Sequence, residues 1–242
     1  MKHFKIFTIG RLFQLLLAVA LFSSCSKDDY YTDGGLAKAE FDGTVLEYLA
    51  SKPVDFDTLV QVIKIAGLED VFNKEEITFF APRDRNIKDL IGSYDIRGSL
   101  NRTLYDEGRD TIKVLSDIDG LIWRKYLERY MFKGRNKLMD YPQIDFNQLL
   151  IFGGQNYYAF NNTVSNIGVV YNDVGGVKYL GYRSIFISFI PDVSRPTEDW
   201  IPVRVTSSDI QPNNGVVHVL DVKGMFGFNV YDVMADVINS KR

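Results

Sequence analysis

Cysteine and histidine are almost absent from this chain. Its 242 residues include one cysteine, Cys25, and two histidines, His3 and His218. A single thiol cannot form an intramolecular disulfide, and a tetrahedral zinc site needs several Cys or His ligands. We therefore expect a fold without disulfides, without a metal site and without a bound cofactor.

The apolar run at the N-terminus is short. It extends over Leu12–Phe22 and follows a basic head that contains Lys2, Lys5 and Arg11. These eleven residues, apolar except for Gln14, reach roughly 17 Å when coiled as a helix, whereas a membrane-spanning helix must cross about 30 Å of hydrocarbon. A basic segment followed by a short apolar one is typical of a secretory signal peptide, so we interpret residues 1–24 as a signal peptide.

The lone cysteine stands at the end of this apolar run. The segment Leu21-Phe22-Ser23-Ser24-Cys25 resembles a bacterial lipobox, in which small residues precede a cysteine that is acylated and becomes the first residue after cleavage. The alternative is an ordinary signal peptide with an unrelated cysteine. The flanks favour lipidation, with palmitate among the acyl chains, and we expect Cys25 to anchor the protein to a membrane.

The residues after the cysteine resemble an export tag. Some Gram-negative bacteria place a short Lys-acidic-acidic tag there to send a lipoprotein to the outer face of the outer membrane, and the matching positions are Ser26, Lys27, Asp28 and Asp29. Residues 25–35 are otherwise polar and end in two glycines, as a flexible tether does. We therefore expect a lipid-anchored outer-membrane protein that faces the cell exterior.

Basic residues are in deficit. Without residues 1–24, 25 Lys and Arg residues remain against 31 Asp and Glu, a formal charge of −6. Nucleic-acid phosphates favour basic patches, so we expect no nucleic-acid partner. No low-complexity segment divides the remaining chain, and its length is sufficient for one well-formed core. We predict a single domain over residues 36–242.

The first part of this domain has helical periodicity. A Thr cap at Thr44 opens a helix to Ala50, and apolar residues recur at helical spacing from Phe56 to Ile63, before Gly67. Further helices are expected over residues 84–91, with Asp84 as the cap, over 121–132 and over 230–238. Residues 92–119 are expected to be irregular.

From residue 149 the period changes to two. Segments rich in β-branched and aromatic residues are separated by turn-forming Gly, Asn and Pro. Strands are expected over residues 77–80, 149–152, 157–160, 164–171, 177–182, 185–190, 201–206 and 216–220. Asn214-Gly215 is expected to supply the positive φ of a tight turn. Helices followed by strands predict an α+β fold with largely antiparallel pairing.

Two segments resemble the paired signatures of the fasciclin-like (FAS1) domain. The first is similar to the family's Thr-x-Phe-Ala-Pro strand and turn, and consists of Thr78, Phe79, Phe80, Ala81 and Pro82. The second is similar to its Asn-Gly-x-x-His-x-x-Asp strand, and its matching positions are Asn214, Gly215, Val217, His218 and Asp221. Residues 63–68 also match the family's opening Leu-x-x-Leu-Gly pattern. Tyr130 matches the Tyr of a central Tyr-His pair, with Met131 in place of the His.

The resemblance implies a fold as well as a family. It implies a fasciclin-like wedge, with a β-sandwich core of largely antiparallel strands and the N-terminal helices packed on its edge. The middle region, residues 92–204, is longer than is usual in the family. In animal members an Asp-Ile pair ahead of the second signature is linked to integrin binding, which makes Asp209 and Ile210 possible ligand contacts. A turn before a buried strand is the alternative reading of that pair.

A catalytic role is not expected. After removal of the signal peptide His218 is the one histidine left, and it lies between Val217 and Val219, where a hydrogen-bonded core residue is more common than a general base. The glycine pairs at residues 153–154 and 175–176 lack the Lys and helix of a phosphate loop. We therefore expect a protein that is not an enzyme.

The leading hypothesis is a cell-surface binding or adhesion module for glycan or surface and matrix protein ligands. Aromatic side chains on the predicted hairpins can present ring faces to sugars or proteins, or can serve cross-strand packing instead. They are Tyr157, Tyr158, Phe160, Tyr171, Tyr179 and Tyr182. The alternative is an accessory subunit of an outer-membrane glycan importer, partnered with its transporter. A glycoside-processing enzyme is a third and weaker class.

Overall fold

Helices and strands occupy largely separate parts of the molecule. The computed structural model describes residues 39–241, which form one compact unit. Its helices are α2 (Val45–Ala50), α3 (Pro53–Ile65), α4 (Glu69–Lys74), α5 (Asp84–Ile91), α6 (Leu100–Asp106), α7 (Gly120–Leu127) and α8 (Val230–Ser240), with 3-10 turns η2 (Leu115–Asp117), η3 (Glu128–Tyr130) and η4 (Leu138–Asp140). Its strands are β1 (Glu40–Phe41), β2 (Ile77–Ala81), β3 (Met131–Lys133), β4 (Gln155–Tyr158), β5 (Val164–Tyr171), β6 (Arg183–Phe189), β7 (Ile201–Pro212) and β8 (Gly215–Leu220).

The strands follow one continuous path. Their order is β3-β2-β8-β7-β6-β5-β4, with β1 paired in parallel to the end of β7. The β2–β8 pair is also parallel, and the other neighbours are antiparallel. The backbone N–H of Phe160, just after β4, donates to the carbonyl oxygen of Met131 in β3 at 2.9 Å, so the path nearly closes. The predicted α+β class with largely antiparallel pairing is confirmed.

Strand β7 joins two parts of the sheet. Its first residues pair with β6, and its later residues pair with β8 through register shifts between Val205 and Ser207 and between Ser207 and Ile210. Such bulges bend a strand and increase its twist. The strands of the two signatures, β2 and β8, therefore lie on one side of β7 together with β3, and β4, β5 and β6 lie on the other.

The helices of the first part begin and end where the sequence predicts. Thr44 Oγ1 accepts from the Glu47 backbone N–H at 3.2 Å, and Glu47 Oε2 accepts from the Thr44 N–H at 2.7 Å, a capping box that starts α2. Gly67 follows α3 with a φ of 66°, and the Leu68 N–H reaches back to the Ile63 carbonyl at 3.1 Å. This left-handed turn ends the helix at low steric cost because glycine has no Cβ.

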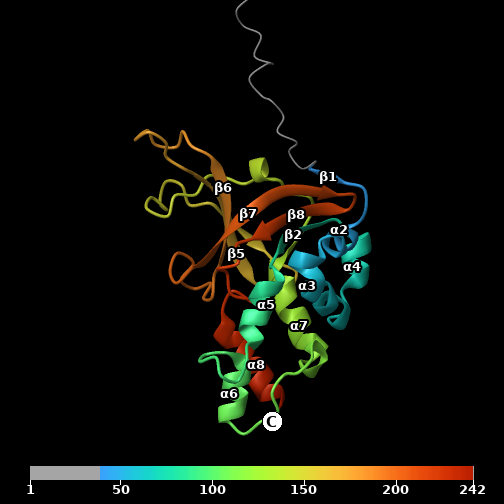
Figure 1. The fold of residues 1–242 in the computed structure, drawn as a ribbon. Coiled ribbons are helices and arrows are strands. Elements are labelled where there is room, and N and C mark those ends of the chain that lie inside the picture. The colour runs from blue at the N-terminus through green and yellow to red at the C-terminus, as the bar shows by residue number, and fades with distance from the viewer. Residues whose placement is uncertain (1–38, 242) are drawn as a thin grey trace, which may run out of the picture. The chain divides into compact units, whose positions relative to one another are not determined.

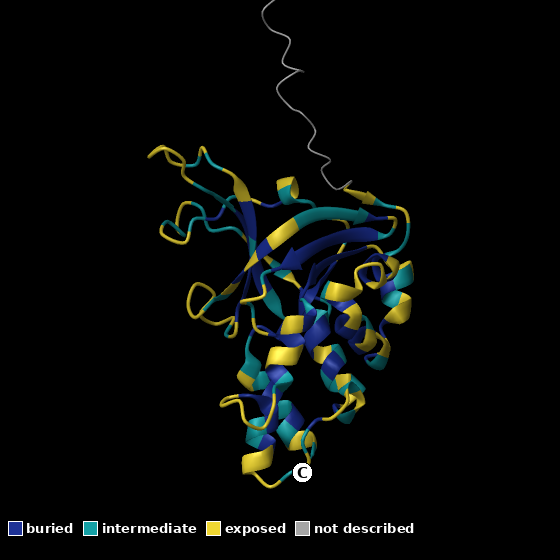
Figure 2. Cartoon of the chain, in the orientation of Figure 1, coloured by how far each residue is buried: buried dark blue, intermediate teal, exposed yellow. Residues whose placement is uncertain are grey.

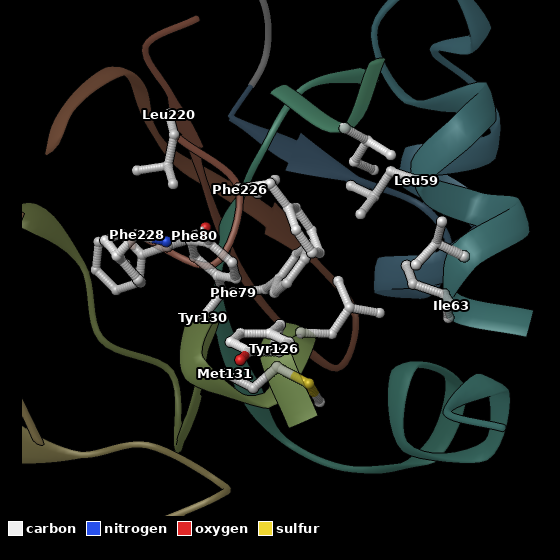
Figure 3. Close-up of a cluster of buried hydrophobic side chains, with 14 of the residues drawn as sticks. Leu59, Ile63, Phe79, Phe80, Tyr126, Tyr130, Met131, Leu220, Phe226 and Phe228 are labelled. Atoms are coloured by element: carbon white, nitrogen blue, oxygen red, sulfur yellow. Dashed lines mark hydrogen bonds between the residues drawn. The ribbon is translucent and has the colours of Figure 1, made fainter. Parts of the chain in front are cut away.

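The core lies between these helices and the strands β2 and β8. Figure 1 places α2, α3 and α4 beside β2 and β8, whereas the yellow and orange loops of the middle region extend to the opposite side. Every residue of β2 and β8 is buried, and Figure 2 shows β8 dark blue along its length beside a largely half-buried or exposed β7. The close-up in Figure 3 shows aromatic rings gathered there, with Tyr130 stacked on Phe228 at a centroid distance of 4.5 Å. The residues of β2 and β8 are buried on both faces of the sheet, which explains why the sequences of these two strands are almost continuously apolar.

Four predicted segments differ from the structure. Residues 92–119, predicted to be irregular, contain α6 and η2, because Ser99 caps a seven-residue helix that buries Leu100 and Leu104. The helix predicted over 121–132 stops at Leu127 and continues as η3 and β3. Residues 149–152 and 177–182, predicted as strands, are loops. Several of their apolar side chains, including Leu150 and Leu180, are exposed, so β-type composition there does not mark a buried strand.

The structure gives Asn214-Gly215 and Asp84 other roles than those predicted. Neither Asn214 nor Gly215 has a positive φ. Glycine is required at 215 for space, because a Cβ there would lie 2.3 Å from the backbone oxygen of Ile77. Asp84 is the first residue of α5 rather than its cap, and its carboxylate accepts from the backbone N–H groups of Thr58 and Leu59 at 2.9 Å each. It therefore ties α5 to α3.

Within residues 39–241, no helix combines the length and apolar character needed to cross a membrane.

Candidate functional site

The structure brings the two signature segments together. Strand β2 carries the first and β8 the second, and they pair in parallel with Phe80 opposite His218. All signature residues in these two strands are buried, and Pro82 is buried directly after β2. The segments that carry the resemblance are thus the centre of the core.

His218 is sealed at this centre. Its exposed fraction is 0%, its Nε2 lies 3.0 Å from the carbonyl oxygen of Asn136, and its Nδ1 accepts from the backbone N–H of Asp209 at 3.3 Å. This arrangement places the proton of the neutral ring on Nε2. Burial lowers the pKa of His218 to about 4, against the smaller opposing effects of the Asn136 hydrogen bond and of Asp209. Neither nitrogen is free to take a proton from a substrate, so the histidine has a structural place.

Asp209 and Ile210 are engaged within the fold. Asp209 sits in the irregular part of β7 with a φ of 61°, and its Oδ1 accepts from the Leu138 N–H at 2.7 Å. Ile210 is half-buried and packs against the core. The carboxylate that was predicted as a possible ligand contact is therefore used to hold η4 against β7.

Other signature side chains fasten separate elements. Asn214 Oδ1 accepts from the Val45 N–H at 2.8 Å, and its Nδ2 donates to the carbonyls of Phe72 and Glu75 at 3.0 Å each. Thr78 Oγ1 donates to the Gly134 carbonyl at 2.8 Å and accepts from the Asn136 N–H at 2.9 Å. These bonds hold α2, α4 and the segment after β3 to the two central strands.

Tyr130 and Asp221 shape the segment after β8. The Tyr130 hydroxyl accepts from the Gly227 N–H at 2.7 Å and donates to the Met225 carbonyl at 3.2 Å, and burial raises its pKa. Asp221 accepts from the Lys223 N–H at 2.9 Å in a turn. Met131, where the family has His, is buried in β3. None of these groups faces an open site.

The hairpin aromatics divide into packed and exposed rings. Tyr157 packs edge-on against Tyr141 at 5.6 Å, and Phe160 packs on the core. Tyr171 lies under the Arg183 guanidinium at 4.4 Å, and the Tyr179 hydroxyl binds Asp145. The two rings that stay mostly exposed are Tyr158, at 75%, and Tyr182, at 64%.

A charged hollow lies where residues 144–147 meet residues 170–179. It has a volume of about 270 Å³, and its polar lining includes Asp145, Asp173, Lys178 and Tyr179. The Tyr179 hydroxyl donates to Asp145 Oδ2 at 2.9 Å and the Asn147 N–H donates to Oδ1 at 2.9 Å. Hydrogen bonds from the Asn147 backbone first, and then from Tyr179, lower the pKa of Asp145. The hollow thus holds a stable negative charge beside the Lys178 side chain.

A second hollow, which we name the amide groove, is lined by the end of the loop at residues 145–154 and by residues farther along the chain. Its volume is about 480 Å³, and its lining includes Gly153, Gly154, Gln155, Asn156, Asn166 and Trp200. These residues come from a loop, two strands and the segment before β7. The sequence contained no motif for this groove, because its parts stand far apart in the chain. The only local signal was the Gly-Gly-Gln-Asn stretch before a tyrosine pair.

Metal binding has no assembled site in the described part. Across residues 39–241, no group of three or more His, Cys, Asp or Glu side chains is arranged to hold a metal ion.

The predicted anchor lies elsewhere in the chain. Cys25 and the tag residues Ser26, Lys27, Asp28 and Asp29 fall outside the residues that the structure describes. Lipidation and export therefore stay predictions from sequence.

Comparison with family models and with curated sequences gives no relative. No protein-family model matches this chain. No curated protein sequence matches it either.

Proposed function

We propose that this protein is a non-catalytic binding or adhesion module, anchored by lipid on Cys25 to the outer membrane and facing the cell exterior. Its ligand is a glycan or a surface or matrix protein. Its fold is proposed to be the fasciclin-like wedge with a β-sandwich core. The pairing of β2 with β8 supports that assignment, because it joins the two segments that resemble the family's signatures.

A binding role is supported by a contrast between the polar side chains of the core, which are bonded within the fold, and those of the middle region, which line open hollows. His218, the one histidine within residues 39–241, has both ring nitrogens occupied by backbone groups. The charged hollow, the amide groove and the exposed rings of Tyr158 and Tyr182 instead lie within the middle region, residues 92–204. Loops of this kind are where binding function is commonly found on a rigid scaffold.

A binding array tests the module. Purified full-length protein in detergent would be applied to arrayed glycans and matrix proteins, and each glycan would also be checked for hydrolysis. We expect retention of at least one ligand without turnover. Hydrolysis of any glycan would overturn the non-catalytic assignment, and co-purification of an outer-membrane transporter would favour the importer alternative.

Cys25→Ala tests the anchor. We expect the variant to move from the membrane fraction to the soluble fraction, because two or more acyl chains bind a bilayer stably whereas one chain binds only marginally. A variant that remains in the membrane fraction would contradict lipid anchoring. Cys25→Ser removes the thiol but nearly keeps the size and polarity of the side chain. It should give the same result, which would show that loss of the thiol, and not the alanine, is the cause.

Asp28→Ala combined with Asp29→Ala tests the outward orientation. Protease added to whole cells should then cleave less of the protein than in the unmodified strain. Equal cleavage in both strains would reject the export tag while leaving the anchor untouched.

A further inference from the structure

We propose that the amide groove binds a neutral oligosaccharide, with the Trp200 ring as its stacking surface and the Asn156 and Asn166 amides as its hydrogen-bonding partners. This inference rests on the proposed binding function and names its ligand class and its site. It is carried by five features of the groove: its lack of charge, the fixed tryptophan, the oriented amides, an unpartnered buried oxygen, and the internal pairing of nearby charges.

The lining of the groove is uncharged. None of its nine lining residues is Asp, Glu, Lys or Arg, although 24% of the chain is charged. The charged hollow, by contrast, has Asp145, Asp173 and Lys178 among its nine lining residues. A charged ligand would lose its hydration in the amide groove without gaining a counter-charge. A neutral polyhydroxylated ligand needs no counter-charge, so this cost does not arise for it.

The ring of Trp200 is held in place. Its Nε1–H donates to the Pro196 carbonyl at 2.8 Å, and the residue is half-buried. Because its only polar atom is already bonded, the indole offers apolar ring surface to the groove. The C–H face of a sugar ring stacks on such a surface, while the sugar hydroxyls need polar partners beside it.

The amides supply those partners in a fixed orientation. Asn156 in β4 and Asn166 in β5 stand opposite each other in register. Asn166 Nδ2 donates to Asn156 Oδ1 at 2.9 Å and to the Gly153 carbonyl at 3.0 Å. The bond to its Oδ1 fixes the Asn156 amide, and Asn156 is exposed, so its Nδ2–H donors are available to a ligand.

One buried acceptor in the groove lacks a protein partner. Asn166 is 3% exposed, and its Oδ1 has no hydrogen bond within the described residues. A Cβ at position 154 would lie 2.4 Å from this oxygen, so the backbone of Gly154 packs closely against it. Buried carbonyl oxygens are normally satisfied, and this one is an unsatisfied polar atom directly beneath the groove lining.

Nearby charges are paired among themselves. Arg195 forms ion pairs with Asp192, Glu198 and Asp199 at 3.1, 3.2 and 3.3 Å. These contacts lie within the segment that carries Trp200. They connect the segment internally, and they turn its charges toward one another instead of toward the groove. The tryptophan thus stands on a cross-linked loop, as a binding platform requires.

Calorimetry with defined sugars tests the inference. Full-length protein in detergent would be titrated with neutral hexasaccharides of glucose, mannose and xylose, and with anionic polygalacturonate and heparin. We expect at least one neutral sugar to bind and the anionic ones to bind at least tenfold more weakly. Trp200→Ala should weaken binding of the neutral sugar at least tenfold, Trp200→Phe should restore most of it, and Asn156→Ala should weaken it severalfold.

Controls separate the site from the fold. Tyr231→Ala removes an aromatic ring that is 74% exposed on α8, outside the groove, and should leave binding unchanged. Circular dichroism would confirm that each variant is folded. If Trp200→Ala does not fold, the double variant Gln155→Ala with Asn156→Ala, at two exposed positions, takes its place.

Each contrary outcome has its own meaning. If a neutral sugar binds Trp200→Ala, or its replacement variant, as tightly as the unmodified protein, the groove is not the site, and the proposed binding function stands. If no neutral sugar binds at about 1 mM, which corresponds to roughly 4 kcal/mol of binding free energy, the ligand class is wrong. Retention of a protein or an anionic glycan would then leave the binding function in place, and hydrolysis of a sugar would overturn that function itself.

Discussion

Two regions of the molecule use the same polar residue types in different ways. One is the centre formed by β2 and β8, and the other is the segment from residue 145 to residue 200. In the centre, Asn214 makes three hydrogen bonds to backbone groups, and His218 makes two. Between residues 145 and 200, Asn156 in β4 is exposed and Asn166 in β5 keeps an unpartnered oxygen. A recognisable sequence segment therefore marks what holds this molecule together, and the open polar chemistry lies in segments without a signature.

Gly215→Ala should have the largest effect on this contrast. The added Cβ would lie 2.3 Å from the Ile77 backbone oxygen, so β2 and β8 would have to separate. We expect a loss of about 3 kcal/mol or more in the free energy of unfolding, measured by urea denaturation. Gly176→Ala is the matched control in the loops, because no atom lies within 4 Å of its added Cβ and only its φ of 78° is unfavourable. A similar loss in both variants would show that packing of the centre is not the cause.

His218 makes the stability of the centre depend on pH. Its pKa is about 4 in the folded chain and ordinarily 6.5, so the unfolded chain binds the extra proton between these values. The free energy of unfolding therefore has its full value above pH 6.5 and decreases as the pH falls toward 4. The total decrease is about 3 kcal/mol, from about 1.4 kcal/mol for each pH unit between the two pKa values.

Urea unfolding at pH 7.5 and pH 4.5 would measure this dependence. His218→Gln should be less stable at pH 7.5 and should lose less stability on acidification than the unmodified protein. An unchanged pH dependence in the variant would assign the effect to other groups.

Tyr179→Phe should have a smaller effect, confined to the loops. It removes the hydroxyl that donates to Asp145, so the pKa of Asp145 should rise toward its ordinary value. We expect only a small loss in the free energy of unfolding, because this single hydrogen bond is partly open to water. Carboxyl titration followed by NMR would report the pKa directly. No change in the titration of Asp145 would mean that the hydrogen bond from the Asn147 backbone, and not the one from the Tyr179 hydroxyl, lowers its pKa.

Tyr158→Ala should have the smallest effect. The side chain is 75% exposed, so we expect a change below about 0.5 kcal/mol in the free energy of unfolding. Tyr157→Ala, one residue earlier, is the control, because its ring packs on Tyr141 and its loss should be clearly larger. Equal effects would show that the outward and inward sides of β4 do not differ as described.

Local patterns predicted the centre well and the loops poorly. The Thr44 cap, the turn at Gly67 and the buried run of β8 depend on neighbouring residues, so the sequence carries them directly. The apolar residues of 149–152 and 177–182 obey the composition of strands but have no partner strand. Composition alone does not reveal a missing partner.

The amide groove could not be predicted for a related reason. Asn156 and Asn166 become neighbours only through the register of β4 and β5, and Trp200 reaches them only through the fold of the segment before β7. Register depends on the whole sheet rather than on a short motif. By contrast, the buried position of His218 followed from its immediate apolar neighbours, which the sequence displays.

Strand β7 also determines how mechanical load would travel. The Gln211 N–H of β7 donates to the Ala39 carbonyl at 2.7 Å, just before β1, which pairs in parallel with the end of β7. β7 in turn is bonded to β8 on one side and to β6 on the other. A pull on the chain at residue 39 would therefore pass through the one strand that both halves of the sheet share. The force would be divided between the two halves before either strand pair had to part.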